Sequence, residues 1–306
     1  MSVTDIIIDV IIRPAVPADL ASIQRICNEV LELEPDAREL PVILSASPER
    51  HAVVAEASGK IVGACFGSMG PRRGDMITGH VELLVVAADA SGHGAGRMLL
   101  TSMEDWLRNQ GAVEVILGAN PPVYLWPGID VRYTAMTCLA IRAGYERFRD
   151  AIDMAVDLTT SDLDYQADEE RLAALGIAVR RAASAEAGLV VSWLRAGPWG
   201  QSTWPDEAAA ALDREPVACH VACRDSGYVG FACHGCVRAG WFGPMGTLAE
   251  EREHGIGSLL LKRCLADMKA AGQSVARIGW VGPVQFYARS VDARIERVYW
   301  LYRKTL

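Results

Sequence analysis

The sequence has no run of the roughly 20 uninterrupted apolar residues that a membrane-spanning helix needs. Its apolar start, residues 1–14, is interrupted by Asp5 and Asp9 and has no basic segment before it, so it does not have the pattern of a secretory signal peptide. We therefore expect a cytoplasmic protein that has no membrane partner.

Basic residues are also in deficit. The chain has 30 Lys and Arg against 38 Asp and Glu, which gives a formal net charge of -8. Broad binding of nucleic acid requires a basic face, so we expect no nucleic-acid partner. The acidic balance suits a cationic or neutral small substrate.

Metal-binding cysteine patterns are few. Of the eight cysteines, those in CHVAC at 219–223 and CHGC at 233–236 have the spacing of a zinc site. The surrounding pattern predicts a hairpin, however, and on a strand Cys219 and Cys223 would lie ~13 Å apart at about 3.3 Å per residue. We interpret these residues as buried thiols and predict no metal site. Because cytosolic thiols stay reduced, we also predict no disulfides.

What the sequence does contain is an internal repeat. Gly94 and Gly255 are 161 residues apart, and so are Gly96 and Gly257. Each copy has the same predicted order: an extended run, a helix, a hairpin, a strand, a turn with two glycines, an amphipathic helix and a further strand. One structural unit is therefore predicted to occur twice.

The length and composition agree with two domains. The chain has 306 residues, of which 51% are hydrophobic, enough for two ordinary cores. Residues 159–175 are polar and rich in charge, as expected of a linker. We predict an N-terminal domain at 1–158, a linker at 159–175 and a C-terminal domain at 176–306.

The repeated glycine turns, SGHGAGRMLL at 91–100 and REHGIGSLLL at 252–261, predict anion-binding loops. The first turn of a helix has backbone N–H groups without partners in the helix, and its dipole favours negative charge. Glycines before the helix let these amides approach a bulky anion, because no Cβ stands in the way. Each copy is thus predicted to contain a strand, a phosphate-binding loop and a helix.

Two common phosphate-binding motifs do not fit. A dinucleotide fingerprint requires a third spaced glycine, which neither copy has. A P-loop requires Gly-Lys-Ser/Thr, but Gly96 is followed by Arg97 and Gly257 by Ser258. The spacing excludes both motifs.

The pattern instead resembles the pyrophosphate loop of the GNAT acetyltransferase superfamily, which is Arg or Gln, two residues, and then Gly-x-Gly. Arg252, Gly255 and Gly257 match it in full, and the first copy matches it with Ser91 in place of the Arg or Gln. Both halves also follow the order of elements of that superfamily. The chain therefore resembles a tandem GNAT protein, an arrangement also seen in mycothiol synthases.

This resemblance implies an α/β fold with two tandem GNAT-like domains, each a mixed, centrally splayed β-sheet flanked by helices, and acetyl-CoA as the co-substrate. In that family the pantetheine arm enters the gap beside the fourth strand, and Pro244 fits a disturbed strand there. The residues that the resemblance assigns to acetyl-CoA are Val85, Val86, Ser91, Gly92, His93, Gly94, Ala95, Gly96 and Arg97 in the first copy, and Thr247, Leu248, Arg252, Glu253, His254, Gly255, Ile256, Gly257 and Ser258 in the second.

The implied reaction is direct transfer of acetyl to an amine. The family often uses a glutamate on the fourth strand as base, and Glu82 occupies that position in the first copy. By the 161-residue offset, the second copy has Gly243 there and lacks this base.

The family's acid is often a tyrosine in the helix after the fifth strand. FYARS at 286–290 resembles that region and makes Tyr287 the candidate acid of the second copy. The first copy has Ala140 at the aligned position. It therefore lacks this acid, unless Tyr124 or Tyr133 substitutes for it.

We therefore expect an N-acetyltransferase for a small amine, with the second domain favoured as catalytic because Arg252 completes its loop and Tyr287 can act as acid. The first domain is either a second active site that uses Glu82 or a retained CoA-binding domain. Two alternatives stay open: a non-catalytic acyl-CoA-binding sensor or scaffold, and a protein-lysine acetyltransferase. The sequence predicts no oligomeric state.

Overall fold

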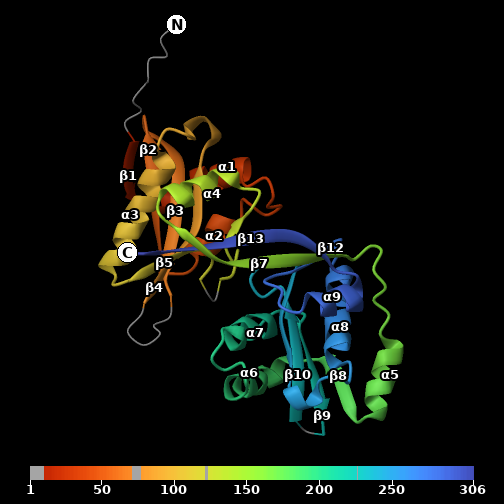
Figure 1. The fold of residues 1–306 in the computed structure, drawn as a ribbon. Coiled ribbons are helices and arrows are strands. Elements are labelled where there is room, and N and C mark those ends of the chain that lie inside the picture. The colour runs from red at the N-terminus through yellow and green to blue at the C-terminus, as the bar shows by residue number, and fades with distance from the viewer. Residues whose placement is uncertain (1–9, 71–76, 121–122, 226) are drawn as a thin grey trace. The chain divides into compact units, whose positions relative to one another are not determined.

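The computed structural model describes residues 10–70, 77–120, 123–225 and 227–306. The prediction that the apolar start of the chain is not a signal peptide concerns residues 1–9 in part, and these lie outside the described residues. By its internal contacts the chain divides into unit 1, Met1–Ala151 with Tyr299–Leu306, and unit 2, Ile152–Val298 (Figure 1).

Unit 1 contains most of the first copy. Its helices are α1 (Leu20–Val30), α2 (Leu40–Ser45), α3 (Ala95–Asn109) and α4 (Thr134–Arg142). Its strands are β1 (Val10–Pro14), β2 (Arg50–Ala57), β3 (Lys60–Met69), β4 (Thr78–Val86), β5 (Glu114–Leu117) and the short β6 (Ile129–Asp130).

From β8 on, unit 2 repeats this order without a counterpart of β6, and α5 precedes β8. Its helices are α5 (Gln166–Ala174), α6 (Ala187–Ala196), α7 (Trp204–Leu212), α8 (Ile256–Ala270) and α9 (Val284–Val291). Its strands are β8 (Ile177–Arg181), β9 (Cys219–Arg224), β10 (Gly227–His234), β11 (Trp241–Thr247) and β12 (Val275–Ile278). Two long strands, β7 (Glu146–Asp157) and β13 (Arg294–Thr305), have residues in both units.

Each unit has a mixed sheet. The strand order is β1-β2-β3-β4-β5-β13 in unit 1 and β7-β12-β11-β10-β9-β8 in unit 2. β4 pairs with β5 in parallel, and β11 with β12 in parallel, whereas their hairpin neighbours are antiparallel. The predicted fold class, two GNAT-like domains with mixed sheets and flanking helices, is confirmed.

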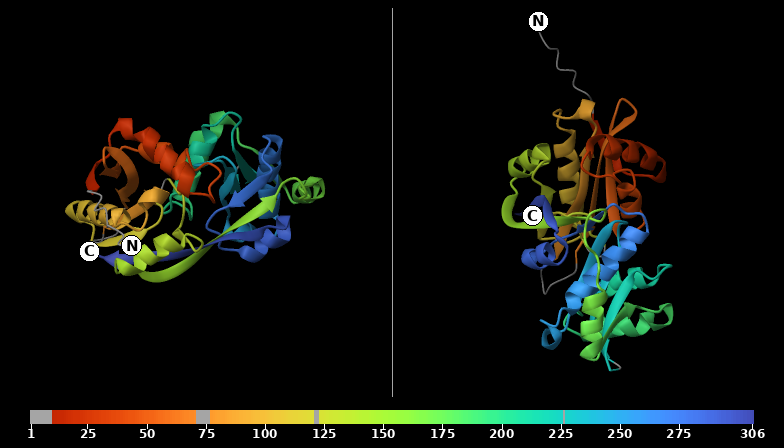
Figure 2. Two further views of the ribbon diagram at one scale, coloured as in Figure 1. Left: turned by 90° about the horizontal axis from the view of Figure 1, so that it is seen from above. Right: turned by 90° about the vertical axis from the view of Figure 1, so that its right-hand side faces the viewer.

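The two copies exchange their last strands. β7 follows α4 of the first copy but pairs with β12, Met154 opposite Ile278, whereas β13 of the second copy pairs with β5, Tyr302 opposite Leu117. Both strands can be followed in Figure 2. The predicted domains, 1–158 and 176–306, assign each of these strands to its own copy. The exchange could not be predicted, because the pattern of a strand does not specify which distant strand it pairs with.

Glycines let α3 lie close against the sheet of unit 1. A Cβ on Gly67 would be 2.6 Å from Met103 Sδ, and a Cβ on Gly79 would be 2.8 Å from Leu107 Cδ2. Met103 and Leu107 belong to the buried core of this unit. This close packing fixes the start of α3 near the end of β4, where the first glycine loop lies.

Among the described residues, no helix has the length and apolar character that crossing a membrane requires. The same part of the chain has no cluster of three or more His, Cys, Asp or Glu side chains that could hold a metal ion. All eight cysteines are free thiols.

Candidate active site

The first glycine loop leads directly into α3. Gly94 is the N-cap of this helix with φ 92°, a left-handed conformation that favours glycine, and no side chain caps the helix. A Cβ built on Gly94 would have no other atom within 4 Å. The amides of the first turn therefore face an open approach, as an anion-binding loop requires.

Beside this loop, β4 separates from β5. The parallel pairing of these strands ends at Val81 opposite Leu117. β4 continues beyond this point and pairs with β3 on its other side, through Val85 with Ala64 and Val86 with Gly63. The backbone of Val85 and Val86 thus borders a gap between two strands, which is the splay that the resemblance to the family implies.

A pocket of about 820 Å³ joins the gap to the glycine loop. It brings together most of the predicted residues of the first copy, while His93 and Ala95 are not among its lining residues. The predicted residues that line it are Glu82, Val85, Val86, Ser91, Gly92, Gly94, Gly96 and Arg97.

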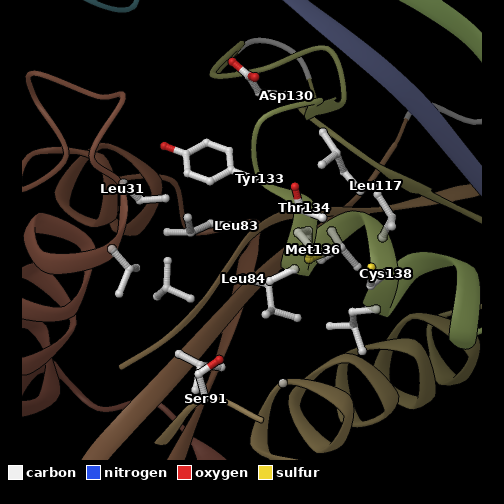
Figure 3. A pocket seen from close by; sticks show the side chains of 18 of the residues that line it. Leu31, Leu83, Leu84, Ser91, Leu117, Asp130, Tyr133, Thr134, Met136 and Cys138 are labelled. Atoms are coloured by element: carbon white, nitrogen blue, oxygen red, sulfur yellow. The ribbon is translucent and has the colours of Figure 1, made fainter. Parts of the chain in front are cut away.

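The segment after β5 and the start of α4 form the other walls of the pocket. Figure 3 shows Ser91 and Asp130 at opposite ends, with the ring of Tyr133 directed into the space between them. The Leu33 amide donates a hydrogen bond to the Tyr133 hydroxyl at 3.3 Å. Tyr133 therefore connects α4 to the segment after α1 across the pocket.

Glu82 is held inside the wall by an ion pair. Arg50 donates to Oε2 through Nε at 2.9 Å and to Oε1 through Nη2 at 3.0 Å, and the Asn120 amide donates to Oε1 at 3.1 Å. The Arg50 and Glu82 side chains are only 3% and 1% exposed. Burial raises the pKa of Glu82, while the bonds from Arg50, Asn120 and Ser68 oppose the rise. The predicted base is thus a carboxylate that already has several donors.

His80, two residues before Glu82 on β4, gives the stability of unit 1 a pH dependence. Burial lowers the pKa of His80 to about 4, so the unfolded chain binds a proton at a higher pH than the folded one does. The contribution of His80 to the free energy of unfolding should therefore be fully present above pH 6.5 and should be lost as the pH falls toward 4.

We expect wild-type protein to lose roughly 2 kcal/mol of unfolding free energy between pH 7 and pH 4.5 through this group. His80→Gln should remove that part of the loss in urea titrations at the two pH values. His93→Gln, in the exposed loop, is the control and should keep the wild-type dependence. An unchanged pH dependence in His80→Gln would contradict the assignment.

The second glycine loop differs from the first at its mouth. Gly255 is the N-cap of α8 with φ 86°, but a Cβ there would be 2.5 Å from Nη2 of Arg171 on α5. Arg171 also donates to the carbonyl oxygen of His254 at 2.6 Å and pairs with Asp168 at 3.1 Å. A guanidinium group thus lies beside this loop, next to Gly255.

The other predicted residues of the second copy lie around this loop. Thr247 lies opposite Gly230 of β10, and the Leu248 amide donates a hydrogen bond to the carbonyl oxygen of Val229, also on β10. The remaining ones span the turn and the start of α8, where Ile256 is buried and Arg252 and Glu253 are exposed: Arg252, Glu253, His254, Gly255, Ile256, Gly257 and Ser258.

Tyr287 lies in the core of unit 2. It is 7% exposed and packs against Phe242 and Phe286 with ring centroids 6.3 and 5.0 Å away. Burial raises its pKa to about 12. Since a thiol has a pKa near 8.5, this phenol is poorly matched to protonate a thiolate.

The structure supports the alignment of Ala140 with Tyr287. A Cβ on Gly96 would be 3.5 Å from Leu139, and a Cβ on Gly257 would be 3.4 Å from Phe286. The next residue in each helix is Ala140 or Tyr287, so unit 1 has no hydroxyl at that position.

Sequence reasoning missed several residues of the pocket. Trp126, Asp130, Arg132 and Arg142 line it but belong to no motif. Their signal was the long segment between β5 and α4 in the first copy, from which only Tyr124 and Tyr133 were predicted to contribute. Tyr124 is not among the lining residues, whereas Tyr133 is.

Comparison with known proteins finds a family match in part of unit 1. Residues 18–123 match the family model of the acetyltransferase (GNAT) family. No curated protein matches the chain.

Several solved structures share the fold. The GCN5-related glucosamine N-acetyltransferase region of a fungal multi-domain GH3 β-N-acetylglucosaminidase has a TM-score of 0.80 at 18% identity; the match covers 97% of this chain but 38% of that one. A GCN5-related N-acetyltransferase from Sphaerobacter thermophilus has a TM-score of 0.68 at 21% identity, with 97% and 95% covered. A tandem GNAT protein from the clavulanic acid biosynthesis pathway has a TM-score of 0.69 at 15% identity, with 97% and 98% covered.

Proposed function

Since the chain carries an acyltransferase domain of the GNAT family in residues 18–123 and has a tandem GNAT fold, we propose that unit 1 transfers acetyl from acetyl-CoA to a small amine. The observation that supports this proposal is the pocket of about 820 Å³, which joins the first glycine loop to the gap beside β4. The sequence favours the second copy as catalytic because of Arg252 and Tyr287, and that expectation stays a prediction.

In this proposal the amides at the start of α3 and the side chain of Arg97 hold the diphosphate. Val85 and Val86 offer backbone groups to the pantetheine arm in the gap between β4 and β5. The amine nitrogen attacks the thioester carbonyl, a C–N bond forms, and the C–S bond breaks. The amine loses a proton and the leaving thiolate gains one.

We propose Tyr133 as the proton donor to the thiolate. Its ring lines the pocket, and a phenol hydroxyl that accepts a hydrogen bond from the Leu33 amide can also donate one. The role of Glu82 as base stays a prediction. Its bonds with Arg50 and Asn120 support a role in holding the wall of the pocket.

Turnover is tested by the release of free CoA thiol with a panel of amines, including a lysine peptide. Thiol release that depends on a small amine supports the enzyme. Release only with the peptide supports a protein-lysine acetyltransferase. Binding of acetyl-CoA without release across the whole panel supports the sensor or scaffold.

The glycine loop is tested by a matched pair of variants on α3. Gly94 and Gly111 lie at the two ends of this helix, both with φ 92° and both with open space at the Cβ position. Alanine at either position costs roughly 1–2 kcal/mol of backbone strain. Only Gly94→Ala adds a methyl group at the loop and favours rearrangement of its amides.

We expect Gly94→Ala to weaken acetyl-CoA binding about tenfold in calorimetry, while Gly111→Ala keeps the wild-type affinity. Equal affinities in the two variants would contradict the first loop as the binding site. The stoichiometry measured with wild-type protein, one or two per chain, reports whether the predicted second loop binds as well.

A further inference from the structure

The wall Trp126–Asp130 forms one end of the pocket in unit 1. Trp126, Gly128, Ile129 and Asp130 all line it. Asp130 lies at the end opposite Ser91 and hence opposite the glycine loop (Figure 3). If the loop holds the diphosphate, as proposed above, this wall faces the acceptor, and we call it the acceptor wall.

The acceptor wall is paired to β13. Tyr299 lies opposite Asp130 and Trp300 opposite Ile129. A few residues later, β13 pairs with the end of β5, Tyr302 opposite Leu117. The segment Tyr299–Tyr302 therefore sets the position of both strands that end at the pocket.

Glycines bring three stretches of backbone into close contact here. A Cβ on Gly128 would be 2.6 Å from the Trp300 carbonyl oxygen, and a Cβ on Gly118 would be 2.7 Å from that of Pro127. Because backbone atoms cannot move aside as a flexible side chain can, a side chain at either position would shift the wall.

Side chains of β13 support the same wall from behind. Tyr299, at 0% exposure, and Leu301 form a buried cluster with Ala151, and Trp126 packs against this cluster. On its other side, Trp126 Nε1 donates to Glu34 at 2.8 Å. The indole ring is thus held between β13 and the segment after α1.

We infer that Tyr299–Tyr302 are positioning residues for the acceptor wall, so that a strand supplied by the second copy determines which amines the first unit accepts. This inference rests on the proposed function of unit 1. These residues act through the acceptor wall and none of them lines the pocket.

The test is Gly128→Ala, which forces the acceptor wall away from Trp300 without touching the glycine loop. We expect about a tenfold lower kcat/KM for the best amine and a changed order of preference across the panel. The KM and calorimetric Kd for acetyl-CoA should stay within about twofold. Gly188→Ala is the matched control, since a Cβ at Gly188 meets nothing within 4 Å, and should change none of these values.

Hydrogen exchange gives a readout that does not depend on turnover. Gly128→Ala should speed exchange in residues 123–130 while leaving residues 91–97 unchanged. Unchanged exchange and unchanged amine preference would overturn the inference, and so would an equal loss of affinity for acetyl-CoA and for the amine. If Gly128→Ala does not fold, Leu301→Val, which trims the support behind Trp126, is judged by the same measurements. Wild-type protein that releases no thiol overturns the proposed function, and the exchange data then still decide whether β13 positions the acceptor wall.

Discussion

Arg50→Ala is expected to lower the free energy of unfolding by about 3–5 kcal/mol. The substitution leaves the carboxylate of Glu82 buried in the wall of the pocket without its guanidinium partner, and the two side chains are only 3% and 1% exposed. Arg50 also donates to the Asn120 carbonyl oxygen at 3.0 Å, so the bond that joins β2 to the segment after β5 is lost as well. Urea unfolding at pH 7 measures the change.

Arg294→Ala is the matched control. The side chains of its pair with Asp292 are 82% and 79% exposed, and removing such a pair changes stability by about 0–1 kcal/mol. If Arg50→Ala proved no more destabilising than this control, the buried ion pair would not hold the wall. Glu82→Gln separates the two roles of the glutamate: loss of stability with catalysis retained supports holding, and loss of kcat in a stable protein supports the base.

Tyr133→Phe is expected to lower kcat about 10²-fold, because the proposed proton donor to the departing thiolate is removed. The ring remains to line the pocket, so the Kd for acetyl-CoA should change little. A hydroxyl that only holds the pocket together would instead change the Kd for acetyl-CoA or the free energy of unfolding, and neither should change by more than about twofold. Steady-state thiol release measures kcat, calorimetry measures the Kd, and urea unfolding measures the stability.

Tyr287→Phe is the corresponding variant of unit 2. If the reaction takes place in unit 1, this substitution leaves kcat near the wild-type value. The opposite result, with Tyr287→Phe inactive and Tyr133→Phe active, would move the chemistry to the second copy, as the sequence alone favoured.

Local patterns were sufficient to predict the two glycine turns and the fold class. A Gly-x-Gly turn between a strand and an amphipathic helix is determined by neighbouring residues, so Gly94 and Gly255 were predicted as N-terminal to helices, and both are N-caps. The resemblance to the family, rather than the repeat, indicated Val85 and Val86 as the residues beside the gap in the sheet.

Contacts between residues distant in sequence could not be predicted in this way. No residue near Arg171 in the sequence indicates that its guanidinium donates a hydrogen bond to the carbonyl oxygen of His254, which is 83 residues away in the sequence. Arg50 gave no signal either, since an arginine at the start of a strand is usually exposed, yet here it is buried against Glu82. The pairing of β13 with β5 and β6 likewise depends on register over a long separation, and the acceptor wall depends on that pairing.

The strand exchange has a consequence for synthesis on the ribosome. Residues up to Ala151 emerge first, but β13, which completes the sheet of unit 1, is translated only after almost all of unit 2. Until then, β6 and the edge of β5 that faces away from β4 lack the strand that pairs with them. Unit 1 therefore has an unpaired strand edge until β13 is synthesised. An exposed edge of this kind can pair with other chains and aggregate, or can be bound by chaperones.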